Sequence, residues 1–246
     1  LILGGSGRTA MTTTEALLKR GFKVVSTTRS GNDPFKVIKL PQLEKDLYTF
    51  GKTVDVTKPN DITSAIATYK PNHVVYAASA SKKGGNAAEV DYKGVLNAAA
   101  AVSITKGCKL ELISALALDQ TESKGYKMTN SMGGVVENIL DYKLMGEEEV
   151  RKRLKAEQYT IIRPGVLMSG KNVGASGIEF NSGDLIGGGL TREELGNVVA
   201  SAIENKKSDG KTVEAYRKST RTKLMPEYAE NSGKEKYSDT WTGLWD

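Results

Sequence analysis

The first ten residues constrain the fold of this chain more than any other stretch of it. An apolar run, Leu1 to Leu3, breaks into glycines at Gly4, Gly5 and Gly7, and a helical pattern follows. This order predicts a strand, a tight turn and a helix N-terminus. Glycine permits positive φ and close approach of the backbone to a ligand, and the free N–H groups that begin a helix attract an anion. The spacing is G-x-x-G-x-x-A, with the small Ala10 where helix and strand must pack closely. We expect a dinucleotide pyrophosphate at this turn, although a plain strand-to-helix turn also favours glycine.

Composition is consistent with one large α/β domain. The chain has 246 residues, of which 39% are hydrophobic and 26% are charged, so it is long enough to bury a sizeable core. Its formal net charge is +6, and residues 1–40 carry most of that excess. This local excess suits a small polyanionic ligand near the glycine turn better than a long nucleic-acid track, although a solvated basic face is the commoner reason for scattered lysines.

Few residues suggest chemistry outside the glycine turn. The single cysteine, Cys108, excludes an internal disulfide and suits a small buried position. The single histidine, His73, has no second ligand nearby in the sequence, so we expect a structural or surface histidine and no metal site. No apolar run is long enough to span a membrane. Because the chain starts without Met and inside a predicted strand, we expect that the natural N-terminus is missing, so a targeting peptide cannot be recognised.

Strand and helix patterns alternate along the chain. Strands are predicted over residues 22–29, 52–56, 73–79, 109–114, 159–165 and 211–216. Helices are predicted over residues 9–20, 43–50, 60–69, 87–105 and 135–155, and a capping box over residues 191–194 opens a further helix. Residues 117–134 read as a mobile loop over the carboxyl edge of the sheet, where ligands bind, and residues 171–189 as a glycine-rich loop. This alternation predicts an α/β fold with a doubly wound, mostly parallel sheet of the Rossmann type and helices on both faces. We expect one domain over residues 1–216 and an extended tail over residues 217–246.

An ordered set of short motifs along residues 1–216 is more specific than any one of them. The set is GGSGRTA, STTRSG, VDVTKP, VVYAASA, EVDYKGVLN, LELISALAL, LMGEEEVRKRL and YTIIRPGVL. It resembles the atypical branch of the short-chain dehydrogenase/reductase superfamily, above all its NmrA-like and plastid NAD(P)-binding members. The resemblance implies dinucleotide binding and suggests a plastid protein, with the cytoplasm as the alternative.

The resemblance also implies positions for the cofactor. It places five residues of the turn around the pyrophosphate, a pair after the third strand at the adenine, and three residues after the fourth strand beneath the cofactor. In that order these residues are Gly4, Ser6, Gly7, Arg8 and Thr9, then Asp55 and Val56, then Ala77, Ala78 and Ser79.

Arg29 bears on the choice between the two dinucleotides. In the family, an acidic residue at the end of the second strand binds the ribose 2′-hydroxyl and favours NAD. Here that strand ends with Thr28, Arg29 and Ser30, and an arginine can pair with a 2′-phosphate. We therefore expect NADP(H) rather than NAD(H), with an Arg29 that merely faces solvent as the alternative.

The catalytic pattern departs from the family. Its well-known enzymes place a tyrosine four residues before a lysine on one helical face, where the tyrosine passes a proton and the lysine holds the ribose. Lys143 matches the lysine, but Ile139 stands where the tyrosine is expected, and Tyr142 lies about 100° round the helix. Ser114 matches the serine that ends the fifth strand and orients a carbonyl. Ser114 and Lys143 are therefore the candidate catalytic residues, with a plain strand-end serine equally compatible with the pattern.

Two kinds of function follow from this departure. Hydride transfer needs mainly positioning, so a reductase of a flavin, quinone or similar conjugated molecule can work without the tyrosine. Other atypical members resemble cofactor sensors, assembly factors or accessory subunits of larger complexes. Because the recognisable acid is gone, the sequence favours the regulatory or accessory role slightly over the enzyme.

The tail contains two tryptophans in a segment with little periodic apolar content. Trp241 and Trp245 predict anchors for a protein partner, since aromatic residues are common hot spots. Docking on the chain's own domain is the equal alternative. Lys and Arg are nearly balanced by acids in this tail, which argues against a nucleic-acid partner.

Overall fold

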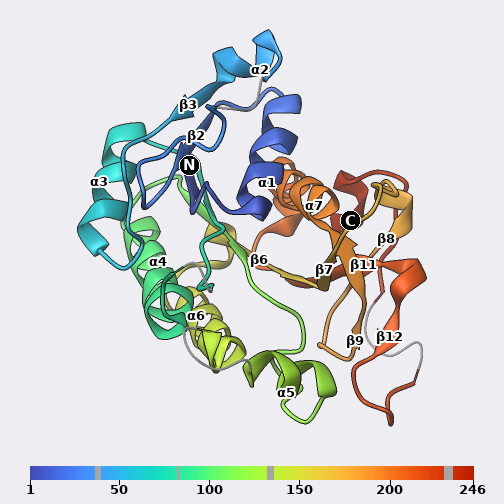
Figure 1. The fold of residues 1–246 in the computed structure, drawn as a ribbon. Helices are drawn as coiled ribbons and strands as arrows, with labels where there is room; N and C mark the ends of the chain where they lie inside the picture. The colour runs from blue at the N-terminus through green and yellow to red at the C-terminus, as the bar shows by residue number, and fades with distance from the viewer. Residues whose placement is uncertain (37–39, 82–83, 132–135, 230–234) are drawn as a thin grey trace.

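Eight strands form one sheet, whose order is β3-β2-β1-β4-β5-β6-β11-β8 (Figure 1). The computed structural model describes residues 1–36, 40–81, 84–131, 136–229 and 235–246. Every neighbouring pair in this sheet is parallel except β11 and β8. The strands are β1 (Ile2–Leu3), β2 (Val24–Thr27), β3 (Tyr48–Phe50), β4 (His73–Tyr76), β5 (Lys109–Ile113), β6 (Tyr159–Pro164), β8 (Ile178–Asn181) and β11 (Thr212–Arg217). The order on both sides of β1 and β4 makes a doubly wound sheet, as the sequence predicts.

Two further strand pairs lie outside the main sheet. The parallel pair is β7 (Val166–Met168) with β10 (Gly189–Thr191), and the antiparallel pair is β9 (Ile186–Gly187) with β12 (Thr222–Lys223). The α-helices are α1 (Arg8–Lys19), α2 (Gln42–Leu47), α3 (Pro59–Tyr69), α4 (Val95–Ser103), α5 (Lys124–Asn130), α6 (Ile139–Arg153) and α7 (Arg192–Glu204). A π-helical segment, η1 (Ala88–Gly94), leads directly into α4. Short 3₁₀ turns include η7 (Thr242–Trp245).

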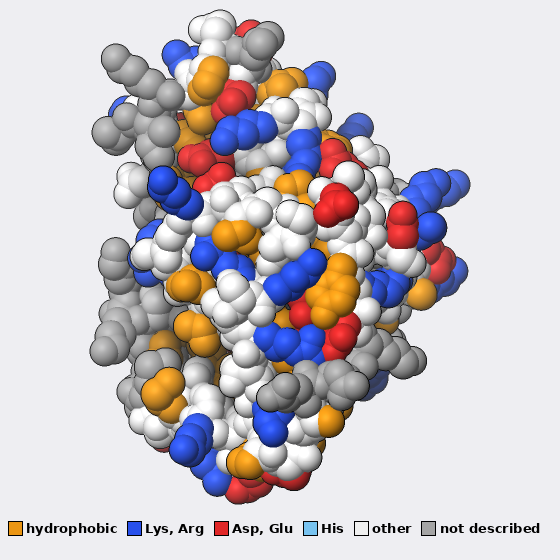
Figure 2. Space-filling model, turned by 90° about the vertical axis from the view of Figure 1, so that its right-hand side faces the viewer, with side chains coloured by type: hydrophobic (Ala, Val, Ile, Leu, Met, Phe, Trp, Pro, Cys, Tyr) orange, Lys and Arg blue, Asp and Glu red, His pale blue; other side chains and the backbone are white. Residues whose placement is uncertain are grey.

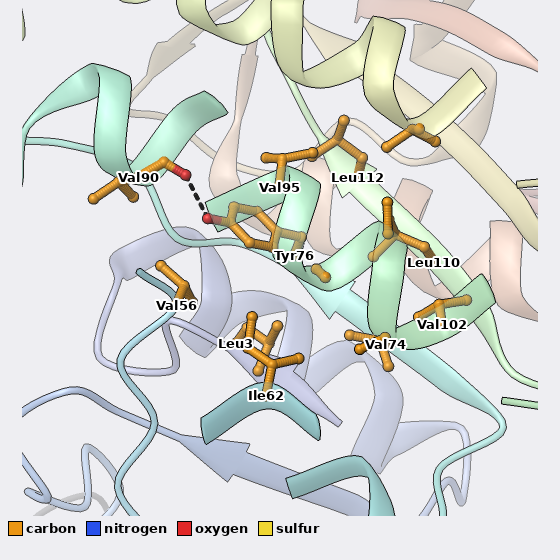
Figure 3. Close-up of a cluster of buried hydrophobic side chains, with 14 of the residues drawn as sticks. Leu3, Val56, Ile62, Val74, Tyr76, Val90, Val95, Val102, Leu110 and Leu112 are labelled. Carbon is orange, nitrogen blue, oxygen red and sulfur yellow. Dashed lines mark hydrogen bonds between the residues drawn. The ribbon is translucent and has the colours of Figure 1, made fainter. Parts of the chain in front are cut away.

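The two faces of the sheet carry separate apolar cores. On one face, α3, α4 and α6 cover a cluster that includes Leu3, Val74 and Leu110 (Figure 3). On the other face, α1 and α7 cover a cluster that includes Ile2, Val75 and Ile162. Side chains of a strand alternate between faces, so β1 and β4 each contribute to both cores. Burial on both faces explains why these strands are short, continuous apolar runs.

Four sequence predictions about local structure are wrong. The predicted helix over residues 43–50 ends at Leu47, and its last three residues form β3. The third strand is Tyr48–Phe50 and not residues 52–56, which follow it as a loop. Apolar and polar residues alternate along that loop as they would in a strand, because Val54 and Val56 are buried. The predicted loop over residues 117–134 contains α5, which has no buried residue and so no apolar period to reveal it.

The predicted glycine-rich loop over residues 171–189 contains β8 and β9. All four residues of β8 are buried, but Glu179 and Asn181 are polar and hide the strand pattern. Their partner is Tyr216, whose hydroxyl donates to Glu179 and accepts from Asn181 Nδ2 at 3.0 Å. The predicted start of the 135–155 helix, Val135, lies outside the described residues, and α6 begins at Ile139.

The C-terminal tail packs on the domain, and the expectation that Trp245 anchors a partner is wrong. Trp245 is fully buried, its ring meets Phe180 edge to face at a centroid distance of 4.8 Å, and its indole N–H donates to Ser201 Oγ at 2.9 Å. Trp241 packs partly buried against the same core. An indole that is buried and hydrogen-bonded is not available to another protein, so the alternative of docking on the chain's own domain holds for Trp245.

Candidate functional site

The glycine turn between β1 and α1 has the geometry of a ligand cradle. Gly4 has a φ of +83°, and a Cβ there would lie 2.7 Å from the Cα of Ala78. A side chain at this position would therefore be strained and would clash with the backbone that follows β4. Gly7 caps α1 without a side-chain bond. Among the described residues, the N–H groups of Arg8, Thr9 and Ala10 have no hydrogen-bond partner, while that of Met11 reaches Gly7 O at 2.9 Å.

These free N–H groups fit an anion. The first turn of a helix leaves its donors unsatisfied, and the helix dipole adds positive potential there. Ser6 and Arg8 are exposed beside them, and Thr9 is half-buried. The turn therefore brings together all five residues that the resemblance assigns to the pyrophosphate.

Arg29 follows β2 at the same edge of the sheet. Its guanidinium lies across Gly84 and Gly85, since a Cβ on Gly84 would be 2.8 Å from Nη2. No carboxylate among the described residues forms an ion pair with Arg29. The first acid after β2 is Asp33, whose Oδ1 accepts from Phe35 N at 2.9 Å and from Tyr48 Oη at 2.7 Å. Asp33 is thus engaged locally, and Arg29 is the charged group at the end of the strand.

The loops after β3 and β4 complete the edge. Asp55 Oδ1 accepts from Thr57 Oγ1 at 2.8 Å, and Val56 O accepts from Asn97 Nδ2 at 3.0 Å. Ala77 N donates to Leu3 O at 3.1 Å, which fixes the segment from Ala77 to Ser79 beside the glycine turn. The structure therefore places all the predicted cofactor residues at the carboxyl edge of the parallel strands, where ligands of such sheets bind.

A buried ion pair lies under this edge. Lys143 Nζ on α6 is 2.7 Å from Asp91 Oδ1 on η1, and the Asp91 side chain has no exposed surface. Asp91 also accepts from Ser79 Oγ at 2.7 Å and from Ala80 N at 2.9 Å. One carboxylate thus joins the candidate catalytic lysine to the segment beneath the cofactor. Sequence reasoning missed Asp91, although it stands within the EVDYKGVLN motif.

Close approach of the two helices makes this pair possible. A Cβ on Gly146 would lie 2.5 Å from Asp91 O, and one on Gly94 would lie 2.3 Å from Tyr76 Oη. Glycine at both positions lets α6 and η1 pack against each other and against β4. Segments of π-helix occur often at functional sites, and this one carries Asp91.

Ser114 and Lys143 line one narrow pocket at the end of β5, which in this structure is too tight to hold a water molecule. The other lining residues are Tyr76, Ala78, Asp91, Val95, Leu112 and Ile113. The Ser114 hydroxyl is buried and has no hydrogen-bond partner among the described residues. An unsatisfied buried hydroxyl is unfavourable, and strain, a catalytic role or a bound water or ion can account for one in a native structure. The pocket therefore joins a free donor and a lysine.

Within the part of the chain that the structure describes, no tyrosine takes the place of the missing acid in this pocket. Ile139 is buried in the core and Tyr142 packs half-buried against it. Tyr76 lines the pocket, but its hydroxyl donates to Val90 O at 2.5 Å (Figure 3). Burial raises the pKa of Tyr76 well above its usual value, which makes it a poor proton donor at neutral pH.

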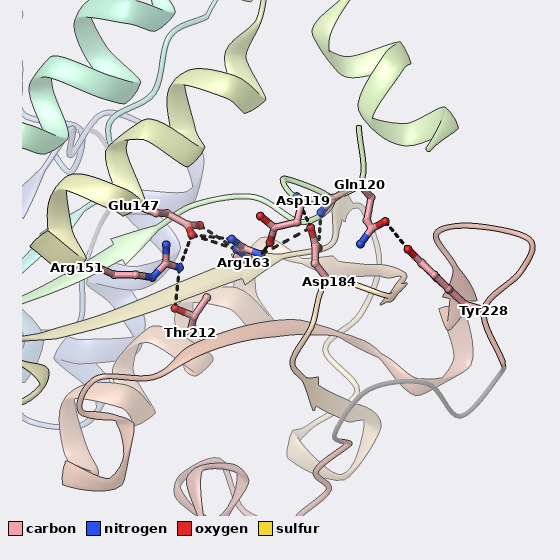
Figure 4. A network of polar contacts seen from close by, with 9 residues as sticks. Asp119, Gln120, Glu147, Arg151, Arg163, Asp184, Thr212 and Tyr228 are labelled. Carbon is pink, nitrogen blue, oxygen red and sulfur yellow. Dashed lines mark hydrogen bonds and ion pairs between the residues drawn. The ribbon is translucent and has the colours of Figure 1, made fainter. Parts of the chain in front are cut away.

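A second charged cluster surrounds Arg163 on β6 (Figure 4). Arg163 Nη2 lies 2.8 Å from Glu147 Oε2, Nη1 lies 2.6 Å from Asp119 Oδ2, and Nη1 lies 3.7 Å from Asp184 Oδ2. Asp184 accepts from the N–H groups of Ala117 and Asp119 at 2.7 and 2.8 Å. Ala117 has a φ of +69°, a strained conformation for alanine. The cluster therefore holds the loop that follows Ser114.

The two other residues considered in the sequence, His73 and Cys108, have structural and not catalytic contacts. His73 Nδ1 lies 2.7 Å from Glu111 Oε1, at the amino edge of the sheet. Cys108 is buried, and burial raises the pKa of its thiol to about 11.

Within the described ranges, no group of three or more His, Cys, Asp or Glu residues has an arrangement that holds a metal ion. No helix in the same ranges is long and apolar enough to cross a membrane. On the face shown in Figure 2, basic side chains are interspersed with acidic and neutral ones and form no continuous track.

The fold and the carboxyl-edge site together define a Rossmann domain that binds a nicotinamide dinucleotide. The model of the NAD(P)H-binding family matches residues 4–206, so the chain belongs to that family. This membership agrees with the resemblance found in the sequence.

Individual relatives agree with this assignment. A UPF0659 protein of Schizosaccharomyces pombe is 25% identical in an alignment over 188 residues, which covers 71% of this chain and 72% of that protein. A short-chain dehydrogenase/reductase from Veillonella parvula in complex with NADP has a TM-score of 0.64 at 14% identity, over 92% of this chain and 97% of that one. The enzyme WbmH of Bordetella bronchiseptica in complex with NAD⁺ has a TM-score of 0.62 at 14% identity, over 91% of this chain and 76% of that one. Structural neighbours thus include both an NADP and an NAD complex, and identities this low show the fold alone.

Proposed function

We propose that this protein is an NADPH-dependent reductase of a small conjugated acceptor, such as a flavin or a quinone. The observation that carries the proposal is the buried, unpartnered hydroxyl of Ser114 in a pocket that Lys143 also lines. A hydroxyl left unsatisfied costs about 1–3 kcal/mol unless a ligand accepts from it. A carbonyl oxygen of an acceptor is the kind of group that this donor fits.

The side chains of the pocket have distinct tasks in this proposal. Bound NADPH supplies the hydride. Ser114 donates a hydrogen bond to the acceptor oxygen, and the Lys143 ammonium stabilises the negative charge that grows there. Asp91 holds Lys143 in place and keeps Ser79 and Ala80 beneath the cofactor. With Ile139 in place of tyrosine, solvent provides the proton that completes the reduction.

The preference for NADP(H) rests on the end of β2. Arg29 is free of ion pairs to the described carboxylates, whereas Asp33 is bound by Tyr48 and Phe35. The free Arg29 guanidinium suits the 2′-phosphate of NADP. The ribose 2′-hydroxyl of NAD would find no free carboxylate at this position to accept its hydrogen bond. Arg29→Ala should weaken binding of NADPH by about 10- to 100-fold and binding of NADH much less. Calorimetric titration with both dinucleotides measures the difference, and an equal loss for both would remove the 2′-phosphate assignment.

One observation favours a second candidate, an accessory or regulatory subunit that binds NADP(H) without turnover. Ile139 is packed in the core, so no tyrosine hydroxyl reaches the pocket from α6. This candidate predicts cofactor binding with no NADPH oxidation in the presence of flavin or quinone acceptors, and stoichiometric co-purification with another protein.

Ser114→Ala tests the reductase directly. Loss of the donor should lower kcat/KM for the acceptor by about 100-fold, which corresponds to roughly 2.7 kcal/mol. NADPH affinity should stay unchanged, and thermal stability should stay the same or rise because an unsatisfied hydroxyl is removed. Ser103→Ala, at an exposed serine that ends α4, is the matched control. Wild-type protein that binds NADPH and reduces no flavin or quinone would favour the accessory subunit instead.

A further inference from the structure

Two arginines far apart in the sequence lie side by side next to the glycine turn. Arg8 is the first residue of α1, and Arg192 is the first residue of α7. The Thr12 hydroxyl lies 2.8 Å from Arg192 O and 3.4 Å from Arg8 O, so one side chain touches the backbone of both. The two helices run alongside each other in Figure 1.

A glycine makes this close approach possible. A Cβ on Gly196 would lie 2.7 Å from Thr12 O, so any other residue would push α7 away from α1. Both helices begin near the carboxyl edge of the sheet, because α1 follows β1 and α7 leads back to β11, which is parallel to β6. The first turn of α7 is therefore held next to the predicted pyrophosphate site.

The charges of the two arginines are not neutralised within the described part of the chain. Arg8 is exposed and Arg192 half-buried, and neither forms an ion pair with a carboxylate there. Burial and the nearby Arg8 lower the pKa of Arg192, and no acidic group counteracts them. By contrast, Arg163 and Arg217 are bound to buried glutamates at 2.8 and 2.9 Å. Two adjacent like charges without an acid are unfavourable unless an anion binds between them.

The free charge is distinct from the end of the helix itself. The N-terminus of α7 is already capped, since Thr191 Oγ1 accepts from Glu194 N at 3.2 Å and Glu194 Oε2 accepts from Thr191 N at 2.8 Å. What remains available is the guanidinium of Arg192, which is close enough to Arg8 for the two positive charges to repel each other.

We propose that Arg192 joins Arg8 in binding the pyrophosphate of the dinucleotide. The site would then include a residue from the last third of the chain, to which neither the glycine pattern nor the family resemblance points. The pyrophosphate is favoured over the 2′-phosphate because α7 leads into β11, whereas Arg29 follows β2 on the opposite side of β1 and β4 in the sheet. This inference rests on the proposed dinucleotide binding.

Titration of Arg192→Gln with three ligands tests the inference. NADPH and ADP-ribose contain the pyrophosphate, whereas adenosine 2′-monophosphate lacks it. We expect the variant to bind NADPH and ADP-ribose about 10- to 100-fold more weakly and adenosine 2′-monophosphate as the wild type does. Arg153→Gln makes the same change of net charge at an exposed arginine at the far end of α6 and should bind all three normally.

A double-variant cycle makes the test independent of either substitution alone. If both arginines contact one pyrophosphate, the losses from Arg8→Gln and Arg192→Gln should not add in the double variant. Unchanged NADPH affinity in Arg192→Gln would overturn the inference, as would a loss confined to adenosine 2′-monophosphate or to the KM of an anionic acceptor. Wild-type protein that binds neither NADPH nor NADH would instead remove the proposed function, so the two failures are distinguishable.

Discussion

Two buried charge clusters attached to the same helix differ in whether their bonding is complete. Lys143 and Glu147 lie one turn apart on α6, and each pairs with an opposite charge from another element. Around Arg163, three carboxylates and two backbone N–H groups leave the guanidinium enclosed. Around Lys143, one carboxylate faces a pocket in which the Ser114 hydroxyl has no partner.

The difference separates a structural role from a functional one. A fully satisfied network contributes to a unique fold, and removal of one member leaves a buried charge unpaired. An incomplete network at a pocket leaves donors for a ligand. We therefore expect substitutions in the Arg163 cluster to change stability, and those in the Lys143 cluster to change cofactor or acceptor chemistry.

The largest expected effect is in the Arg163 cluster. Glu147→Gln should lower the free energy of unfolding by about 3 kcal/mol, because Arg163 loses its bidentate buried partner. Urea unfolding measures this loss, and Glu148→Gln at the exposed neighbouring position should change stability by less than about 0.5 kcal/mol. A loss below about 1 kcal/mol in Glu147→Gln would mean that Asp119 and Asp184 suffice to compensate Arg163.

Lys143→Met should have the opposite profile. Asp91 keeps its bonds to Ser79 and Ala80, so the loss of stability should be smaller than for Glu147→Gln. The kcat/KM for the acceptor should fall by about 100-fold, because the variant loses the ammonium group that stabilises the negative charge on the acceptor oxygen. NADPH oxidation and urea unfolding are measured on the same samples, with Lys152→Met on the exposed face of α6 as control. A variant that is strongly destabilised yet fully active would reverse the roles of the two clusters.

The last prediction concerns the pH dependence of stability beside the Arg163 cluster. Burial, with the nearby Asp184 carboxylate, raises the pKa of Glu214 from 4.5 to about 8. The folded state therefore holds a proton that the unfolded state releases, and the free energy of unfolding should fall as pH rises from about 4.5 to about 8. We expect this fall to vanish in Glu214→Gln, because glutamine does not titrate in this range. Parallel pH profiles of unfolding in the wild type and the variant would show that another group causes the slope.

Particular residues show how far local pattern reaches. The glycine turn was identified from its own residues, because backbone freedom is a local property. Arg29, Ser114 and Lys143 were identified by position, through the family resemblance. Asp91 and Arg192 were missed because their roles depend on which helices pack together. Glycines 94, 146 and 196 permit that packing, but nothing adjacent in the chain says what each of them faces.

Contacts between distant segments also change which of the two proposed functions, accessory subunit or reductase, is favoured. The lost tyrosine and the two tail tryptophans favoured an accessory subunit when only the sequence was considered. Burial of Trp245 against Phe180 removes one of those arguments, and the unpartnered Ser114 hydroxyl adds one for the reductase.

The sequence by itself determined the fold class, the glycine cradle and the departure from the tyrosine–lysine pair, since each depends on residue type at short spacing. The tertiary structure alone decided where the edge strand β8 lies, where the tail docks and which charges remain without a partner. These outcomes depend on contacts between segments up to 180 residues apart, and the free energy of a buried charge is set by the groups that enclose it in space.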